Sequence, residues 1–245
     1  MQKFSWKRAL RTGIQALALF GTLSFIPLAG SGQVLITLIF GDKLNSPGLE
    51  FGLEGGVNFS SIEGLESPAA LPQFNLGFYF DIRLKNQWYV YTGVLVKATM
   101  GSNELTYNDL LALESEIIAD GGTFSQRTES FIIPALIKRR IFRIGYIEAG
   151  PQLAYVYDGN IRHTYSTGDV DFLIQENNRD MLNRIDAGFL VGGGFRLSEG
   201  VGPSFGVKYY FGLTEVYQNA TGYQNRGWFL KMNLPIGAKK TGDSN

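Results

Sequence analysis

Apolar and polar side chains alternate one by one through long stretches of this chain of 245 residues. The stretch at residues 74–85 is the clearest, with six apolar residues at every second position and Asn, Gly, Tyr, Asp, Arg and Lys between them. Successive side chains of a strand point to opposite faces, whereas an amphipathic helix repeats its apolar residues every three or four positions. The alternation therefore predicts a β-strand with one apolar face and one polar face.

The same alternation recurs in other parts of the chain, and in total it predicts eight strands. The remaining stretches begin near residues 49, 88, 131, 147, 185, 205 and 228. Three connections are short, at residues 85–87, 139–140 and 198–200, and longer polar segments join the other strands. Short turns at one end and long loops at the other are typical of barrels of the bacterial outer membrane. We therefore predict an all-β fold, an eight-stranded antiparallel up-and-down transmembrane β-barrel at residues 48–237, with short periplasmic turns and long extracellular loops.

The alternation alone does not say which face of the barrel points outward, because a soluble barrel of the lipocalin type carries its apolar face inside. Glycine favours the membrane barrel: it makes up 31 of the 245 residues and occupies much of the polar face, where it suits a narrow lumen. The apolar face carries aromatic residues near strand ends, as the interfacial girdle of a membrane barrel does. These predicted interfacial aromatics are Trp88, Tyr155, Tyr157 and Trp228.

Charged residues of both signs lie on the polar face. Charges removed from water are tolerated when they are paired. We therefore predict that these residues form a salt-bridged network that fills the barrel lumen. The predicted network comprises Glu50, Glu54, Asp81, Arg83, Lys97, Lys138, Glu148, Arg184, Asp186, Arg196, Lys208 and Lys231.

The composition limits the chemistry that the chain can perform. The absence of cysteine excludes disulfide scaffolds, thiol catalysis and zinc sites built from Cys, and the single histidine argues against a His-rich metal site. The 22 basic and 22 acidic residues give no footprint for nucleic acid. We expect no cofactor, no metal site, no catalytic residue and no nucleic-acid partner.

The first 32 residues are predicted to be a secretory signal peptide. Four basic residues precede an apolar stretch at residues 14–28, and small residues follow it. A retained membrane anchor is the alternative, since residues 34–40 are apolar again. The polar break at residues 30–33 and the shortness of the first apolar stretch favour cleavage. Export followed by folding of the barrel places the protein in the bacterial outer membrane.

Two further segments flank the predicted barrel. Residues 33–47 follow the signal peptide and are expected on the periplasmic side. Their apolar part either packs beneath the barrel floor or docks on a partner, because it is too apolar to hang free in water and too short to span a bilayer. Residues 238–245 form a predicted C-terminal tail.

Three segments carry a resemblance to a known family. Residues 41–60, which read GDKLNSPGLEFGLEGGVNFS, are similar to the opening of the PorT-like outer-membrane β-barrel proteins of Bacteroidetes. The segments IPALIK at 133–138 and YIEAGP at 146–151 resemble two strands of that family in the expected order. The resemblance covers residues 41–236 and implies an eight-stranded outer-membrane barrel; some relatives are accessory parts of the type IX secretion and gliding machinery. This chain departs from the pattern by continuing past Ile236 instead of ending on an aromatic residue.

His163 and Ser166 are the candidates for hydrolytic chemistry, because outer-membrane lipid A deacylases place a His and a Ser close together on a strand. Their spacing puts the two side chains on opposite faces of an extended segment, so we interpret His163 as a histidine of a surface loop. Residues 103–120 have apolar residues at near-helical spacing and predict a short helix in a long loop. A solvated acidic loop is favoured over a calcium site for Asp169, Asp171, Glu176 and Asp180, which lack the spacing of a calcium loop.

Two classes of function fit the sequence. The first is a structural or interaction barrel of the cell envelope, with a role accessory to type IX secretion as one form of it. The second is an outer-membrane lipid-modifying enzyme similar to the lipid A deacylases; a narrow pore is a third, disfavoured because side chains fill an eight-stranded barrel. We expect no enzymatic activity. The expected partners are outer-membrane lipid, lipopolysaccharide and an envelope or secretion complex.

Overall fold

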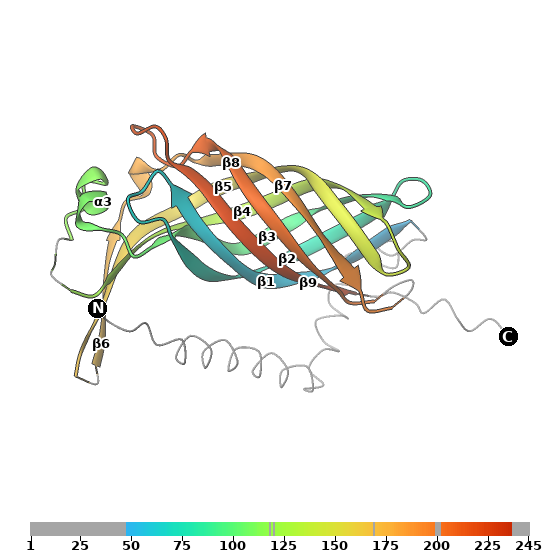
Figure 1. The fold of residues 1–245 in the computed structure, drawn as a ribbon, viewed down its shortest axis with the longest axis horizontal. Coiled ribbons are helices and arrows are strands. Elements are labelled where there is room, and N and C mark those ends of the chain that lie inside the picture. Colours follow the sequence, from blue (N-terminus) through green and yellow to red (C-terminus); the bar gives the residue numbers. More distant parts are fainter. Residues whose placement is uncertain (1–47, 118, 120, 169, 199–201, 237–245) are drawn as a thin grey trace. The chain divides into compact units, whose positions relative to one another are not determined.

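The computed structural model describes residues 48–117, 119, 121–168, 170–198 and 202–236 (Figure 1). The predicted signal peptide at 1–32, the segment 33–47 and the tail 238–245 lie outside the described residues. The described elements, in chain order, are β1 (Leu49–Glu63), β2 (Ala69–Arg83), β3 (Trp88–Asn103), α3 (Tyr107–Ala112), β4 (Thr123–Arg140), β5 (Gly145–Thr167), β6 (Val170–Asn177), the 3-10 helix η2 (Arg179–Met181), β7 (Ile185–Arg196), β8 (Ser204–Glu215) and β9 (Gln224–Pro235).

Eight of these strands form a closed antiparallel ring. Their order around it is β4, β3, β2, β1, β9, β8, β7 and β5, and pairing between β4 and β5 closes the circle (Figure 1). Closure gives every strand of the ring a partner on both sides, which is what a sheet needs in lipid. The predicted eight-stranded up-and-down barrel is confirmed. We call the end with the β2–β3, β4–β5 and β7–β8 turns the turn end, and the opposite end the loop end.

The strand β6 lies outside the ring and was not predicted. It pairs with the outer part of β5, from Asn160↔Asn177 to Thr167↔Val170, and the two form a hairpin that extends past the loop end (Figure 1). Residues 172–174 read Phe-Leu-Ile, so β6 breaks the regular alternation of apolar and polar positions. The pattern that identified the ring strands was therefore absent from β6.

The ring strands continue further towards the loop end than the sequence predicted. β1 ends at Glu63 and β2 begins at Ala69, so five residues connect them where a long loop was expected. In this upper part the inward side chains of Ile62 and Leu71 are apolar and buried, and outward positions such as Glu63 are polar and exposed. The distribution of apolar residues between the two faces is thus inverted here. For this reason the alternation did not predict that the strands continue to this end.

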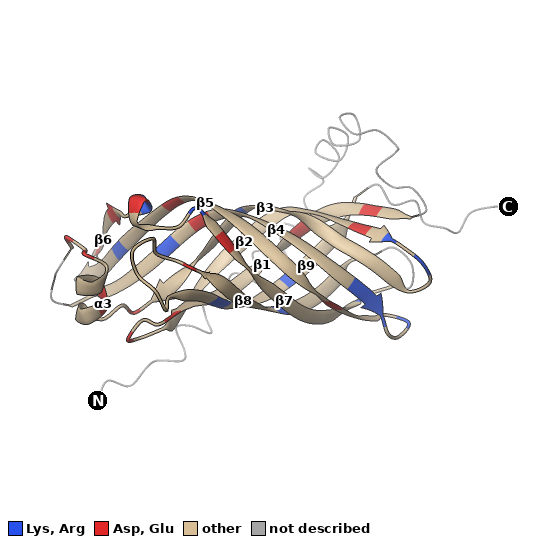
Figure 2. Ribbon diagram, turned by 90° about the horizontal axis from the view of Figure 1, so that it is seen from above, with Lys and Arg blue, Asp and Glu red and all other residues tan. Residues whose placement is uncertain are grey.

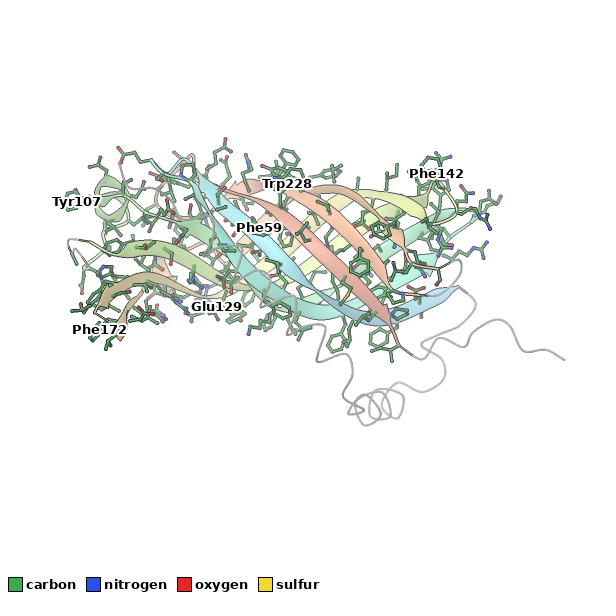
Figure 3. All side chains as sticks on the ribbon, turned by 60° about the horizontal axis from the view of Figure 1, so that its bottom comes forward. Phe59, Tyr107, Glu129, Phe142, Phe172 and Trp228 are labelled. Atoms are coloured by element: carbon green, nitrogen blue, oxygen red, sulfur yellow. The ribbon has the colours of Figure 1, made fainter. Side chains whose placement is uncertain are left out.

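Over the rest of the ring the outer face is apolar and the inner face is polar. The side chains of Phe59 and Trp228 point away from the barrel (Figure 3), and Ile133 is exposed on the same wall. On the same strands Asn58 and Lys231 are buried inside. An apolar wall around a polar lumen is the arrangement of a membrane barrel, and the soluble alternative with an apolar lumen does not hold.

The short helix predicted within residues 103–120 is confirmed with narrower bounds. α3 spans six residues and begins with a capping box: the Asp109 N–H donates to the Thr106 side chain, and the Thr106 N–H donates to the Asp109 carboxylate. Leu110 is buried beneath the helix. Among the helices described, none is both long and apolar enough to cross a membrane.

Candidate functional site

Nine of the twelve residues of the predicted charge network lie in the barrel lumen. Eight are buried, and Glu50, near the turn end, is partly exposed. They come from seven strands of the ring, many of them distant in sequence, and the lumen brings them together. The nine are Glu50, Glu54, Asp81, Lys138, Glu148, Asp186, Arg196, Lys208 and Lys231.

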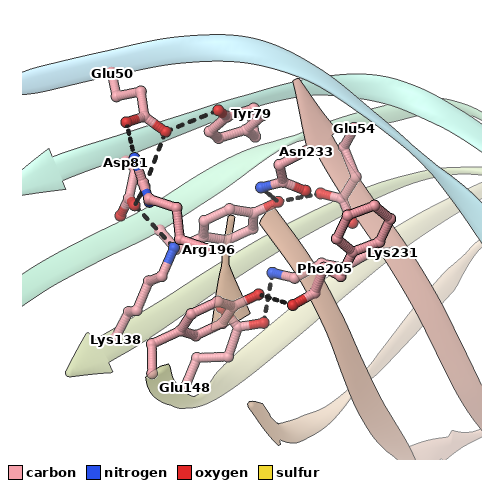
Figure 4. Close-up of polar contacts among 12 residues, drawn as sticks. Glu50, Glu54, Tyr79, Asp81, Lys138, Glu148, Arg196, Phe205, Lys231 and Asn233 are labelled. Carbon is pink, nitrogen blue, oxygen red and sulfur yellow. Dashed lines mark hydrogen bonds and ion pairs between the residues drawn. The ribbon is translucent and has the colours of Figure 1, made fainter. Parts of the chain in front are cut away.

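Arg196 and Lys138 bind two carboxylates close to the turn end (Figure 4). The Arg196 guanidinium contacts both carboxylate oxygens of Glu50, at 2.6 and 3.1 Å, and lies 3.6 Å from Asp81. The Lys138 Nζ donates to Asp81 at 2.8 Å, and the Tyr79 hydroxyl donates to Glu50 at 2.8 Å. Each cation therefore has an anion within contact distance, which offsets the cost of removing it from water.

Glu54 and Lys208 form a second ion pair deeper in the lumen. The Lys208 Nζ donates to Glu54 at 2.9 Å, and both side chains are almost fully buried. The Tyr91 hydroxyl donates to the other oxygen of Glu54 and accepts from the Asn233 side chain at 3.1 Å (Figure 4). A neutral donor and an ammonium thus share one buried carboxylate.

Lys231 and Glu148 form the third ion pair, with 2.5 Å between Nζ and Oε1. The Lys231 ammonium also lies 3.9 Å from the centre of the Tyr91 ring, within the range of a cation–π interaction. The Tyr146 hydroxyl donates to the Phe205 carbonyl at 3.2 Å (Figure 4). The ion pairs are thus embedded among tyrosine rings.

Asp186 lies in the lumen nearer the loop end and is held by neutral donors. Its carboxylate accepts from the Tyr210 hydroxyl at 2.8 Å, the Asn225 amide at 2.9 Å and the Thr214 hydroxyl at 3.2 Å. The predicted network is therefore two sets, one of ion pairs and one of hydrogen bonds around a single carboxylate.

Glycines leave the space that the tyrosines occupy. A Cβ atom added to Gly206 would lie 2.5 Å from the Tyr146 hydroxyl oxygen, and one added to Gly194 would lie 2.6 Å from it. The rings of Tyr79 and Tyr91 stack at 5.7 Å between centroids. Aromatic rings and paired charges together fill this part of the lumen.

Arg83, Lys97 and Arg184 do not belong to the network, contrary to the sequence prediction. All three are exposed. Lys97 lies at a bulge in β3, where the register with β2 shifts after Leu76↔Lys97 and the inward alternation is interrupted. Arg83 is the last residue of β2, and Arg184 precedes β7 and donates towards the Tyr155 hydroxyl at 3.4 Å on the outer wall.

The four predicted interfacial aromatics all lie on the outer wall. The exposed fractions are 42% for Trp88, 43% for Tyr155, 39% for Tyr157 and 53% for Trp228. Trp88 begins β3 at the turn end, whereas Trp228 packs against Tyr209 further towards the loop end. That these residues sit at the boundary between lipid and water stays a prediction.

A cluster of buried apolar residues, the loop-end cluster, closes the other end of the lumen. Burial there raises the pKa of the Tyr217 hydroxyl. At the edge of the cluster Glu66 accepts hydrogen bonds from the Thr106 hydroxyl at 2.7 Å and the Asn108 amide at 2.9 Å, which hold the pKa of its carboxyl below the usual range. The cluster comprises Ile62, Leu65, Leu105, Leu110, Leu113, Phe124, Val156, Ile161, Leu182, Val216 and Tyr217.

His163 is buried in β5, so its interpretation as a surface-loop histidine is wrong. Its ring stacks between Phe124 and Tyr165, with centroids at 4.2 and 5.0 Å, and its Nε2 lies 2.8 Å from the Gly121 carbonyl oxygen. Ser166 donates instead to Asp171, at 2.5 Å. Asp169 lies outside the described residues, and within the described ranges no group of three or more His, Cys, Asp or Glu is placed to hold a metal ion.

Sequence reasoning missed the neutral members of the lumen. Tyr79, Tyr91 and Asn233 contact the buried charges but were not counted among the site residues. The signal that identifies them is their position, because they occupy polar-face positions of their strands, in phase with Asp81 and Lys231. Tyrosine at such a position suits a partly polar lumen better than a lipid-facing wall.

Several solved outer-membrane proteins are similar to this chain. Ail, the attachment invasion locus protein of Yersinia pestis, is 12% identical over 78% of this chain and 99% of its own, with a TM-score of 0.40. Neisserial surface protein A is 12% identical over 76% of this chain and 98% of its own, also at 0.40. The toluene transporter TodX of Pseudomonas putida is 12% identical over 83% of this chain and 72% of its own, at 0.30. No curated protein matches the sequence.

The family is established by the sequence itself. Residues 42–218 match the family described as outer membrane protein beta-barrel domain, and this region includes every ring strand except β9. A closed sheet, an apolar outer wall and a polar lumen are the features of such a barrel, and this chain has all three. The chain belongs to the outer membrane protein beta-barrel domain family and is an outer-membrane β-barrel protein.

Proposed function

We propose that this protein is an interaction barrel of the cell envelope, which the ring anchors in the outer membrane while its surfaces bind a partner. The filled lumen carries this proposal. Lys138, Lys208 and Lys231 are each 2–4% exposed and ion-paired, and the loop-end cluster covers the other end of the same lumen. Side chains that fill the lumen in this way favour a binding role for the outside of the molecule over conduction through it.

The β5–β6 hairpin is the surface that best suits a partner. Phe172, Leu173 and Ile174 of β6 are exposed, and Phe172 lies at the far loop end in Figure 3. Among the described strands β6 pairs with β5 alone, so its other edge presents unpaired backbone groups. Such an edge accepts an extended segment of another protein as an added strand. We therefore assign the hairpin as the docking element.

The resemblance to PorT-like proteins of Bacteroidetes supports a partner in the type IX secretion machinery. It rests on the segments at 41–60, 133–138 and 146–151. Of these, the segments at 133–138 and 146–151 build β4 and β5, the strands that carry the hairpin and close the ring. We expect lipopolysaccharide to surround the part of the outer wall that is nearest the loop end.

The proposal includes the absence of enzymatic activity. The two side chains considered for hydrolysis are engaged separately, since His163 contacts the Gly121 carbonyl and Ser166 donates to Asp171. A nucleophile and its base need a hydrogen bond between them. These separate contacts support a binding role over a lipid-modifying one.

The test is capture of the protein from native outer membranes. We expect a secretion component to co-purify with the unaltered protein and to be lost from a variant with Leu173→Lys and Ile174→Lys, which charges the β6 edge. The matched control is Asn219→Lys, which adds one charge to the exposed β8–β9 connection. Recovery of the same components with all three proteins, or of the barrel alone, would contradict the proposal.

A further inference from the structure

The turn end carries a group of basic side chains that the lumen network does not use. Arg83 ends β2, Lys85 lies in the β2–β3 turn, and Arg139 and Arg140 end β4 (Figure 2 shows blue segments at this end). In the part of the chain that the structure describes, none of these four takes part in an ion pair with a carboxylate, whereas the lumen cations do. Their positive charge is therefore available to a ligand.

Aromatic side chains lie beside these cations; Trp88 and Phe142 are exposed and Tyr89 is buried. The Arg139 guanidinium lies 5.1 Å from the centre of the Trp88 ring, and Arg140 lies 4.6 Å from that of Tyr89. Phe142, in the β4–β5 turn, is 75% exposed and points away from the barrel (Figure 3). The four cations, Trp88 and Phe142 form what we call the basic collar.

The direction of the collar side chains distinguishes a lipid from a soluble partner. Arg139 follows Ile133 and Ile137 at alternate positions of β4, so it continues the row of outward side chains on the apolar wall. Trp88 begins the corresponding row of β3 and pairs with Arg139 in register. Arg139 and Trp88 thus face sideways, at the level where the apolar wall ends, which is the level of lipid headgroups. Arg83 and Arg140 follow Asp81 and Lys138 on the inward face of their strands and lie where that face ends.

The two turns that carry the collar, β2–β3 and β4–β5, contain no opposing charge. Residues 82–90 and 137–147 include no Asp or Glu. The lumen carboxylates nearest in sequence, Asp81 and Glu148, are engaged with Lys138 and Lys231 inside the barrel. An anion that approaches these two turns from outside therefore meets positive charge, and arginine presents its donors as a fork that matches phosphate oxygens.

We propose that the basic collar binds the phosphate groups of anionic phospholipids, such as phosphatidylglycerol, in the membrane leaflet at the turn end. Arg139 holds the phosphate and the other three cations add positive charge beside it, while Trp88 and Phe142 lie against the glycerol and upper acyl region. This selects the lipids next to one end of the barrel and requires no protein partner. It is therefore independent of the docking function assigned to the hairpin.

The chain supplies two natural probes for a test. Its three tryptophans are Trp6, Trp88 and Trp228, and the last two lie on the outer wall at different levels. Two reporter versions of the full chain are refolded into vesicles of phosphatidylcholine containing brominated phosphatidylglycerol or, separately, brominated phosphatidylcholine. One reporter carries Trp6→Phe and Trp228→Phe, and the other carries Trp6→Phe and Trp88→Phe. Bromine quenches a tryptophan that it touches, so the ratio of quenching reports which lipid is enriched there.

We expect Trp88 to favour phosphatidylglycerol over phosphatidylcholine on the order of fivefold at low salt, with the preference falling as salt rises. Trp228 serves as the internal reference and is expected to show a ratio near one. Equal quenching of Trp88 by the two lipids would overturn the proposal, and this comparison needs no charge variant.

Charge variants then identify the side chains. Arg83→Gln, Lys85→Gln and Arg139→Gln together are expected to bring the Trp88 ratio to about that of Trp228, while Arg184→Gln, at an exposed arginine remote from the turn end, leaves it unchanged. A slower-migrating band after heating in SDS confirms that each variant is folded. Full preference for phosphatidylglycerol in the triple variant would exclude an anionic-lipid site at these side chains. Binding of soluble polyglutamate to the collar, with a Trp88 quenching ratio of one, would exclude it as well.

Discussion

The barrel lumen is closed in two different ways along its length. Towards the turn end it is filled by ion pairs such as Glu54–Lys208 and Lys231–Glu148, and at the loop end by the loop-end cluster. The outer face changes in the opposite sense, from an apolar wall to polar positions such as Glu63. Where lipid surrounds the strands, their apolar side chains point outward and their polar side chains point into the lumen. Where water surrounds the strands, the apolar side chains point inward. Whether lipid or water surrounds the strands thus determines whether polar or apolar side chains fill the lumen.

The largest effect is expected from breaking one ion pair of the lower lumen, by which we mean the part of the lumen towards the turn end. Lys208→Met leaves the Glu54 carboxylate buried without its ammonium, and we expect the free energy of unfolding in detergent micelles to fall by about 3–5 kcal/mol. Urea titration, followed by the heat-dependent mobility of the barrel in SDS gels, measures it. The control is the double variant Glu54→Gln with Lys208→Met, which removes both charges and is expected to recover most of the loss. A single variant as stable as the unaltered protein would show that the pair is not structurally required.

A cavity in the loop-end cluster is expected to act locally. Leu182 is fully buried there, and Leu182→Ala is expected to cost about 2–5 kcal/mol of local stability. The ion pairs in the part of the lumen towards the turn end stay intact in this variant. We therefore expect faster proteolysis of the loop-end connections with unchanged heat-dependent mobility of the barrel. Leu173→Ala, at an exposed position of β6, is the control and should leave both measurements unchanged. Loss of the heat-dependent mobility in the Leu182 variant would show that the two ends unfold together.

Crowding of the lower lumen is expected to have an intermediate effect. Gly206→Ala puts a Cβ atom 2.5 Å from the Tyr146 hydroxyl oxygen, and we expect a loss of about 1–3 kcal/mol in the same urea titration. Gly55→Ala, also in a ring strand, places its Cβ no closer than 4.0 Å to Leu76 and is the matched control, expected within ~0.5 kcal/mol of the unaltered protein. Equal effects at the two sites would contradict tight packing around Tyr146.

The smallest effect is expected at the helix of the loop end. Thr106→Ala removes the side-chain cap of α3 and the hydrogen bond to Glu66, and we expect a local loss of about 1 kcal/mol. Hydrogen exchange of the α3 amides measures it. Thr106→Ser keeps both hydrogen bonds and is expected to retain the slow exchange; fast exchange in both variants would assign the stability of α3 to packing of Leu110 alone.

Alternation predicted the part of the fold that lipid surrounds. In β2 the outward direction of Phe78 and the inward direction of Asp81 follow from the pattern alone. The pairing of inward charges, such as Asp81 with Lys138, follows from the cost of burying a single charge. Lys97 was misplaced because a bulge interrupts the phase of β3, and no residue type marks that bulge in the sequence. The partner of each charge was not predictable, since Glu54 and Lys208 are brought together by closure of the ring.

The loop end was predicted poorly for a physical reason. Alternation identifies a strand when one face meets lipid and the other meets a polar lumen, and beyond the apolar wall both conditions change. Ile62 and Leu71 belong to ring strands but are apolar on the inward face, and β6 is exposed on both faces. His163 looked like a loop residue because its strand partner, β6, was not predicted.

The conductance of the purified barrel tests the central claim most directly, because a lumen filled by paired charges below and an apolar cluster above has no continuous path for ions. The full chain, shown to be folded by its heat-dependent mobility, is inserted into planar bilayers in 1 M salt (about 3 Å screening length), which favours detection of a pore. We predict insertions without steady conductance. Large, steady open-channel currents in most insertions would contradict the account of the lumen and, with it, the proposed interaction function.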